Sequence, residues 1–414
     1  MTSTPSSTSV SRLLRWSAGL LAGLVLAAMI FEVALRAMEA SPWWRVLPAV
    51  HAQFDGPDPE LGYAHRRNVS GLWIRENRAF VSMNAQGLRD RSRSQLPAPG
   101  VLRIAVAGDS ITEAMQVDEP DLFTLRAERK LADRGERVEV LNFGSSGALP
   151  LQQLLFLADR GLPMGIDAAV FMFAASDFLN SLMRNDRFLP AYVDDSSGNL
   201  VIGRSYRSRS SHRLADRWAG RAFFWVVDHS RVANALYIRA KTGFLSGESI
   251  KAARPSGNES CKELRESALE QQRLWIEGEP QWAARRVDRF LADVSVLLKG
   301  KPAIFMLWGF GLPERACTEA TELRTRVVAQ ARKKIEAAGI SFVDVDMATL
   351  GKMGDESGFQ KLGGFGARLG YGHLNPWGHE IYAQVLTDAI TSRFSNLLQR
   401  GKSACSAPNC SGQN

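Results

Sequence analysis

Five short apolar runs, separated by stretches with helical patterning, constrain the fold of this chain more than any other feature. A brief apolar run that ends at a turn residue is typical of a buried strand in a parallel sheet. Strands that alternate with amphipathic helices predict βαβ units with right-handed crossovers. The runs span residues 102–107, 138–143, 169–174, 303–308 and 340–345, and helical patterns follow at 322–339 and 379–394. The sequence therefore predicts an α/β domain on a parallel sheet.

An uncharged apolar segment near the N-terminus, residues 16–31, indicates a membrane anchor. With the apolar residues that resume after Glu32, residues 16–37 approach the roughly 20 residues that a helix needs to cross a bilayer. Arg12 and Arg15 precede the segment, which favours a cytoplasmic tail at 1–15 and export of the rest. A cleaved signal peptide is the alternative, because the strictly apolar run is short. We expect a single-pass inner-membrane protein whose main domain is periplasmic.

The remaining chain divides into a lead-in, a main domain and a tail. Residues 38–100 have the turn signals of loops and short strands, and the main domain is expected at 101–395. An arginine-rich, partly helical stretch at about 185–300 interrupts the strand–helix rhythm and predicts an insertion. Its basic side chains would attract acidic polysaccharide or lipid headgroups, or form a solvated face. Residues 396–414 are polar and are expected to be flexible.

Composition excludes some functions. The chain has 414 residues and a formal net charge of +8, but it has no basic motif interleaved with aromatic residues, so we expect no nucleic-acid partner. The six histidines do not have metal-ligand spacing, and we expect no metal or cofactor. An even number of cysteines suits an oxidising compartment, with Cys405–Cys410 and Cys261–Cys317 as conceivable pairs. Four free or buried thiols are the alternative.

The candidate nucleophile is Ser110, in Gly108-Asp109-Ser110, directly after the first predicted strand. Open α/β sheets place their sites at the carboxyl ends of strands. The alternative role for Ser110 is a helix cap.

Two later motifs complete a candidate site. Residues 142–147 (NFGSSG) follow the second strand, and glycines there let backbone N–H groups approach a reacting oxygen. Residues 372–379 (GHLNPWGH) open the last helix, where His373 could reach the serine as a general base. His379, six residues later, is expected to be structural.

Taken together, these motifs resemble the SGNH hydrolase superfamily, the GDSL-type esterases and lipases. The blocks Gly-Asp-Ser, Asn-x-Gly-x-x-Gly and His-x-Asn-x-x-Gly-His occur in the family's order over about residues 101–395. The lead-in also resembles that of bacterial membrane-anchored members. The resemblance implies a flavodoxin-like three-layer α/β/α sandwich, with Ser110 as nucleophile and His373 as base. The backbone N–H groups of Ser110 and Gly144 would be oxyanion donors.

Two positions depart from the family pattern. Ser176 stands where an asparagine usually donates to the oxyanion, and its shorter hydroxyl is expected to donate poorly or through water. The carboxylate that usually precedes the histidine is absent, since Gly370 and Tyr371 stand there. Asp344, Asp346 and Asp355 are weak substitutes, and a backbone carbonyl is the favoured orienter of the imidazole.

Three functions are compatible with these motifs. The first is a serine esterase that removes acyl groups, with acetyl as one candidate, from an extracytoplasmic glycan or lipid. The second is an O-acyltransferase that modifies an envelope polysaccharide. The third is a glycan-binding scaffold with weak activity, because the site rather than the fold decides function. The oligomeric state is not readable from the sequence.

Overall fold

The computed structural model describes most of the chain, with gaps. The described residues are 7–39, 54–73, 76–174, 186–187, 189–209, 217–233, 236–237, 261–309, 318–354, 358, 361–366, 369 and 372–405. The chain divides into two compact units: unit 1 contains Met1–Gln53 and Leu214–Ser249, and unit 2 contains Phe54–Arg213 and Ile250–Asn414. Unit 1 thus combines the N-terminal segment with part of the predicted insertion.

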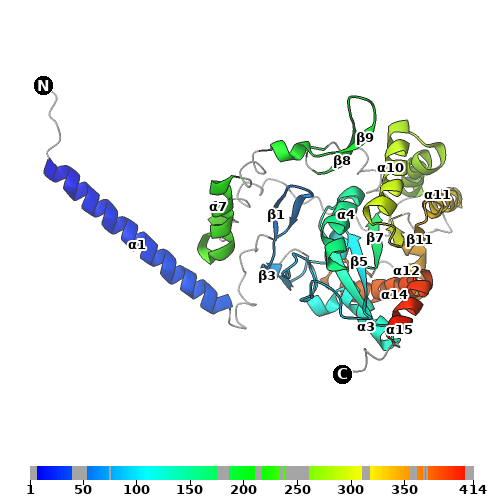
Figure 1. Cartoon of the computed structure of the whole chain (residues 1–414), viewed down its shortest axis with the longest axis horizontal. Helices are drawn as coiled ribbons and strands as arrows, with labels where there is room; N and C mark the ends of the chain where they lie inside the picture. The colour runs from blue at the N-terminus through cyan, green and yellow to red at the C-terminus, as the bar shows by residue number, and fades with distance from the viewer. Residues whose placement is uncertain are drawn as a thin grey trace. The chain divides into compact units, whose positions relative to one another are not determined.

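A five-stranded parallel sheet forms the centre of unit 2 (Figure 1). Its strands are β5 (Leu102–Gly108), β6 (Val138–Gly144), β7 (Ala168–Ala174), β10 (Ala303–Trp308) and β11 (Ser341–Asp344). They lie in the order β11-β10-β7-β5-β6. The second strand, β6, lies on one side of β5 and the three later strands lie on the other side, as in flavodoxin-like sheets. All five predicted strands are confirmed. Their near-continuous apolar sequences fit strands covered on both faces.

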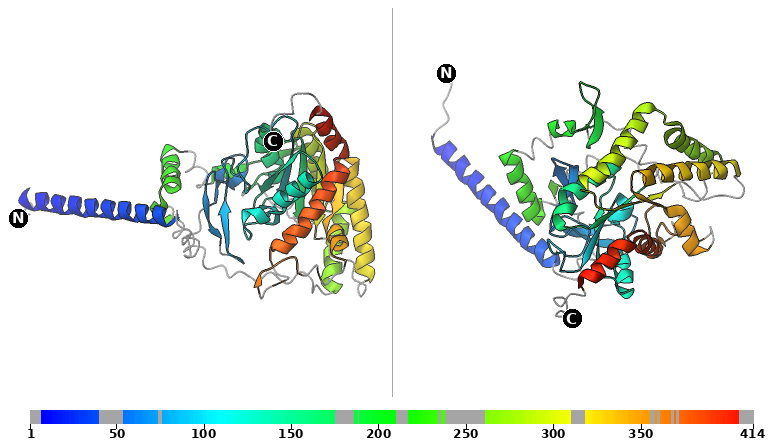
Figure 2. Two further views of the ribbon diagram at one scale, coloured as in Figure 1. Left: turned by 90° about the horizontal axis from the view of Figure 1, so that it is seen from below. Right: turned by 45° about the vertical axis from the view of Figure 1, so that its right-hand side comes forward.

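Helices cover both faces of this sheet (Figure 2). One buried cluster joins the sheet to α4 (Pro150–Phe156), α10 (Gln281–Leu297) and α11 (Thr318–Ala337). The other joins it to α3 (Phe123–Asp133), α12 (Val345–Met353), α14 (Pro376–Arg393) and α15 (Ser395–Cys405). Alternate residues of β5 belong to different clusters, Ala105 to the first and Val106 to the second, as strand geometry requires. The predicted three-layer α/β/α fold is confirmed.

Short strands and helical turns fill the connections. The lead-in forms two antiparallel pairs, β1 (Asp55–Asp58) with β2 (Gly62–His65) and β3 (Ser70–Trp73) with β4 (Ala79–Ser82). Between β7 and β10 lie the pair β8 (Ala191–Asp194) and β9 (Leu200–Gly203), followed by α9 (Cys261–Gln272). The short turns are α2 (Ser110–Glu113), η2 (Glu119–Asp121), η3 (Leu157–Gly161), η4 (Leu162–Met164), η5 (Ser205–Ser208) and η6 (Arg273–Glu277).

Unit 1 contains the long helix α1 (Ser7–Glu39) and the shorter helix α7 (Trp218–His229). Within α1, residues Arg15–Ala37 are long and apolar enough to cross a membrane, and the most apolar part of this span is not buried by protein. The span matches the predicted anchor. Cys317 and Cys410 lie outside the described residues, and with them both predicted disulfides.

Candidate active site

Ser110 lies at the sheet's carboxyl edge, where β5 turns into α2. The Asp109 side chain caps this turn by accepting a hydrogen bond from the Ile111 N–H at 2.9 Å. Gly108 permits the sharp turn, because a Cβ there would lie 2.0 Å from Thr112 Oγ1. The local backbone structure thus explains why the motif contains this glycine and this aspartate. Together they place the serine at the end of the strand.

A line of three side chains connects Ser110 to a carboxylate. Ser110 Oγ and His373 Nε2 lie 2.8 Å apart, and His373 Nδ1 lies 2.8 Å from Glu76 Oε1. Glu76 also accepts a hydrogen bond from the His373 backbone N–H at 2.9 Å. With the proton of the neutral imidazole held on Nδ1 by Glu76, Nε2 accepts the Ser110 hydroxyl proton. This is the arrangement of a nucleophile, a general base and an orienting acid.

Backbone contacts of its loop hold His373 in place. The His373 carbonyl accepts a hydrogen bond from the Gly364 N–H at 2.9 Å. Asn375 caps α14 by accepting from the N–H groups of Trp377 and Gly378, and its amide donates to the Lys361 carbonyl at 2.7 Å. The asparagine of the His-x-Asn block therefore fixes the loop that carries the histidine.

Glu76 comes from the loop of the β3–β4 hairpin in the lead-in. It adopts a left-handed backbone conformation with φ of 64°, which is uncommon for a residue with a side chain. The Asn77 amide donates to the Gln116 carbonyl at 2.8 Å, and the Phe80 N–H donates to Asp118 Oδ1 at 2.8 Å. These contacts fasten the hairpin to the loop that follows α2, the helical turn that begins at Ser110.

Gly372 makes room for the carboxylate. Its φ is 83°, and a Cβ at this position would lie 2.4 Å from Glu76 Oε2. A residue with a side chain would therefore displace Glu76 as well as strain the backbone.

The pair shifts the pKa of both groups. Burial acts to lower the pKa of His373, but the hydrogen bond and charge of Glu76, with Asp109 and Glu113 nearby, outweigh it and raise the pKa above the usual value. Burial acts to raise the pKa of Glu76, but its contacts with His373 lower it overall. Glu76 is therefore a carboxylate near neutral pH and stabilises the imidazolium that forms when His373 takes a proton.

Glu76, and none of the predicted aspartates that the structure describes, lies against His373 Nδ1. Asp344 instead caps α12 and forms an ion pair with Arg324 at 2.8 Å, while Asp346 accepts from the Gly309 N–H at 3.2 Å. Asp355 lies outside the described residues. The expected backbone carbonyl is also wrong, since a carboxylate occupies the Nδ1 side of His373.

The predicted role of Gly144 needs correction as well. Its N–H donates to Asn142 Oδ1 at 2.8 Å, so it is not available to an oxyanion. Its missing Cβ has a packing reason, because a Cβ would lie 2.1 Å from the Glu113 backbone nitrogen. The N–H groups of Ser110 and of Gly147, in the turn after β6, have no acceptor among the residues that the structure describes. Ser176 lies outside those residues.

A second histidine lies behind the site, fully buried. His65 Nδ1 is 2.6 Å from Asp55 Oδ1, and Nε2 is 3.0 Å from Glu113 Oε1. Burial acts to lower its pKa, but the two carboxylates raise it to about 10. Glu113 also accepts a short hydrogen bond from Ser146 Oγ, in the turn that contains Gly147. The nitrogen and oxygen atoms with which Asp55, His65 and Glu113 could bind a metal ion lie within 4.8 Å of one another. With its pKa raised, the imidazole lies between the two carboxylates as the cation of a buried ion pair.

His379 has a structural role, as expected. It is buried, its Nδ1 accepts from the Phe123 N–H at 3.3 Å, and burial lowers its pKa to about 3. It therefore remains a neutral acceptor that joins α14 to α3.

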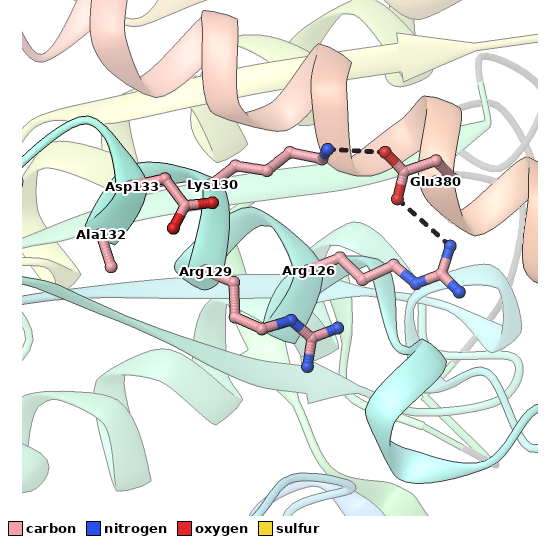
Figure 3. A pocket seen from close by; sticks show the side chains of 6 residues that line it. All are labelled: Arg126, Arg129, Lys130, Ala132, Asp133 and Glu380. Carbon is pink, nitrogen blue, oxygen red and sulfur yellow. Dashed lines mark hydrogen bonds and ion pairs between the residues drawn. The ribbon is translucent and has the colours of Figure 1, made fainter.

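A hollow of about 500 Å³ lies between α3 and α14 (Figure 3). Glu380 forms ion pairs with Arg126 at 3.3 Å and Lys130 at 2.6 Å, and Arg129 donates to the Pro120 carbonyl. The cationic groups are thus already engaged, and neither Ser110 nor His373 lines the hollow.

No family model and no curated protein sequence matches the chain. Solved structures do resemble it. The lipase/acylhydrolase from Enterococcus faecalis is 14% identical, with 71% of this chain and 97% of that one covered and a TM-score of 0.33. A lipolytic protein of the G-D-S-L family from Veillonella parvula DSM 2008 is 10% identical, with 70% and 99% covered and a TM-score of 0.32. The acetyl xylan esterase AlAXEase is 13% identical, with 70% and 100% covered and a TM-score of 0.34. The G-D-S-L family that the motifs resemble is represented among these neighbours, and the chemistry assigned to the site rests on its own geometry.

Proposed function

We propose that this protein is a membrane-anchored serine esterase that hydrolyses acyl esters through Ser110, His373 and Glu76. The observation that carries the proposal is the unbroken line of contacts from the Ser110 hydroxyl through the imidazole to a carboxylate. The serine can act as nucleophile, the imidazole as base and the carboxylate as the group that orients the imidazole. The imidazole is half-buried rather than fully buried. A sealed histidine could not meet a substrate.

The reaction follows from these positions. His373 Nε2 takes the proton from Ser110 Oγ as the oxygen attacks the ester carbonyl carbon. The tetrahedral intermediate collapses, the C–O bond to the alcohol breaks, and the imidazolium returns its proton to the leaving oxygen. A water molecule, deprotonated by the same nitrogen, then attacks the acyl-serine and releases the carboxylic acid. Glu76 keeps its negative charge throughout and stabilises the imidazolium.

The oxyanion needs hydrogen-bond donors that have no other acceptor. The Ser110 N–H meets this requirement, and we assign the Gly147 N–H as the second donor. Gly147 has φ of 71° and is part of the turn held by the Tyr63 hydroxyl, which donates to the Ser146 carbonyl at 2.5 Å. Removing one donor of this kind typically costs about 10²–10³ in rate.

The substrate class follows from the anchor. An exported domain, attached by residues Arg15–Ala37, meets extracytoplasmic acylated glycans and lipids, so we propose that one of these carries the ester. Arg12 before the span and Arg15 at its first position support a cytoplasmic N-terminus.

Hydrolysis of p-nitrophenyl acetate by the full chain in detergent micelles tests the activity. We expect Ser110→Ala to lower kcat by about 10⁴–10⁶, since the nucleophile and its base act as a unit. Ser392→Ala, an exposed serine of α14, is the matched control and should leave turnover unchanged. A fluorophosphonate probe should label the wild-type chain and the control but not Ser110→Ala.

Turnover that survives in Ser110→Ala would overturn the assignment. Adding an oligosaccharide acceptor to the same assay reads the fate of the acyl group. Free acetate as the product supports hydrolysis, and acetylated sugar detected by mass spectrometry would identify a transferase instead.

A further inference from the structure

Helix α7 in unit 1 has an exposed apolar face. Trp218, Ala222 and Trp225 have the i, i+4, i+7 spacing of one helical stripe, and Val226 lies beside this stripe. Trp218 is 77% exposed and Trp225 is 60% exposed. Large aromatic side chains at such exposure on a single helix indicate a surface that meets something apolar.

The opposite face of α7 packs within the protein. Val227 is buried, and the rings of Phe223 and Phe224 lie 5.9 Å and 6.2 Å from the Tyr237 ring in edge-on arrangements. The exposed stripe is therefore the outer side of a helix with a fixed orientation in its own unit.

Hydrogen bonds attach the C-terminal end of α7 to the end of the apolar helix α1. Arg36 Nη2 donates to the His229 carbonyl at 2.6 Å. Glu32 Oε2 accepts from Ser230 Oγ at 2.9 Å and from the Val232 N–H at 3.1 Å. Glu32 and Arg36 also pair with each other at 2.7 Å. Every one of these contacts lies within unit 1.

This attachment sets the depth of α7 relative to a bilayer. The candidate span ends at Ala37, and at a rise of about 1.5 Å per residue Glu32 lies only about 8 Å before that end. The boundary between acyl chains and headgroups falls in this zone when the span crosses a membrane. Tryptophan is enriched at that boundary because its ring is apolar and its N–H is polar.

We infer that α7 is a second membrane contact, an interfacial helix whose face of Trp218, Trp225 and Val226 enters the headgroup region of the leaflet where α1 ends. The inference rests on the proposed anchor. The exposed guanidinium groups of Arg217 and Arg221, beside Trp218, fit anionic lipid headgroups. One anchor leaves a domain free to rotate about a helix axis, whereas a second contact fixes unit 1 against the bilayer surface.

Tryptophan quenching by brominated lipid tests this inference with the full chain. The protein is placed in vesicles of phosphatidylcholine and phosphatidylglycerol whose acyl chains carry bromine near the headgroup. We expect Trp218→Phe and Trp225→Phe each to remove the quenchable emission of one of the chain's ten tryptophans. Two reporters are needed, because Trp225 stacks on His229 with centroids 4.4 Å apart and its own emission is affected by that ring.

Matched variants separate the two proposals. Trp16→Phe, at the start of the span, reports the anchor, and Trp282→Phe on α10 in unit 2 is the control that should leave quenching by lipid unchanged. If Trp16→Phe lowers the quenchable emission and neither α7 variant does, the anchor stands and the interfacial helix is wrong. If Trp16→Phe has no effect, the anchor itself fails. If the α7 tryptophans are shielded from both brominated lipid and aqueous iodide, protein covers this face, which also overturns the inference.

Discussion

Two histidines of unit 2 lie against carboxylates, and they differ in what surrounds their second ring nitrogen. His373 has one carboxylate, Glu76, and its other nitrogen faces the Ser110 hydroxyl. His65 has a carboxylate on each side, Asp55 and Glu113. The His373 side chain is 25% exposed, whereas that of His65 is 1% exposed. One ring can therefore exchange its proton with a substrate, while the other is held charged.

This difference shows that a raised pKa alone does not identify a catalytic histidine. Both rings have a raised pKa, and the larger shift belongs to His65, whose side chain is the more buried of the two. A proton-transfer role requires a free nitrogen in reach of a nucleophile, and only His373 meets that requirement of the two.

Replacing the acid of the first pair should have the largest effect. Glu76→Gln keeps the size of the side chain but removes the charge that stabilises the imidazolium, so we expect kcat to fall by about 10²–10⁴ while KM changes little. Steady-state hydrolysis of p-nitrophenyl acetate measures both constants. Glu336→Gln, an exposed carboxylate of α11, is the control and should keep wild-type rates. Equal kcat values for Glu76→Gln and wild type would show that this carboxylate is a bystander.

Replacing the second histidine should affect stability rather than chemistry. His65→Gln leaves Glu113 buried without a cation, and losing one partner of a buried pair typically costs about 3–5 kcal/mol of unfolding free energy. Urea unfolding of the full chain in detergent measures it. Asp55→Asn should cost less, because Asp55 is partly exposed. An unchanged unfolding midpoint in His65→Gln would contradict the assignment of a buried ion pair.

The two pairs should also differ in pH dependence, the smallest of these effects. His373 must be neutral to act, and its pKa is raised, so activity should rise with pH along a limb centred above the ordinary value of 6.5. Glu76→Gln should move that limb to lower pH. His65 is stabilising while protonated, so its contribution to stability is complete below pH 6.5 and is lost as pH rises towards about 10. Profiles of kcat/KM and of the urea unfolding midpoint between pH 5 and 10 separate the effect of His373 from that of His65. If both profiles changed over the same pH range, the two histidines would not differ in the way described.

The sheet was predictable because its signal is local. A strand covered on both faces is mostly apolar, and each of the five runs is readable in six letters. The meeting of Ser110 and His373 was also predictable, because parallel strands place their carboxyl ends at one edge.

Glu76 was missed because nothing local indicates its role. It lies 297 residues from His373 in the sequence, in a short hairpin loop whose left-handed residue is not a glycine. Gly144 was misassigned for the opposite reason. The motif is visible, but whether its N–H is free depends on the Asn142 side chain, which folds back onto the end of its own strand.

The position of Glu76 in the β3–β4 hairpin limits how far this chain can be shortened. A shortened form that starts at β5 would retain the serine and the imidazole but would lack the acid that lies 2.8 Å from the ring. Such a truncation would keep the Gly-Asp-Ser and His-x-Asn motifs but lose the carboxylate, so we expect the minimal active fragment to begin upstream of the sheet. Chimeras that exchange the region ahead of β5 should be judged by whether the incoming loop delivers a carboxylate.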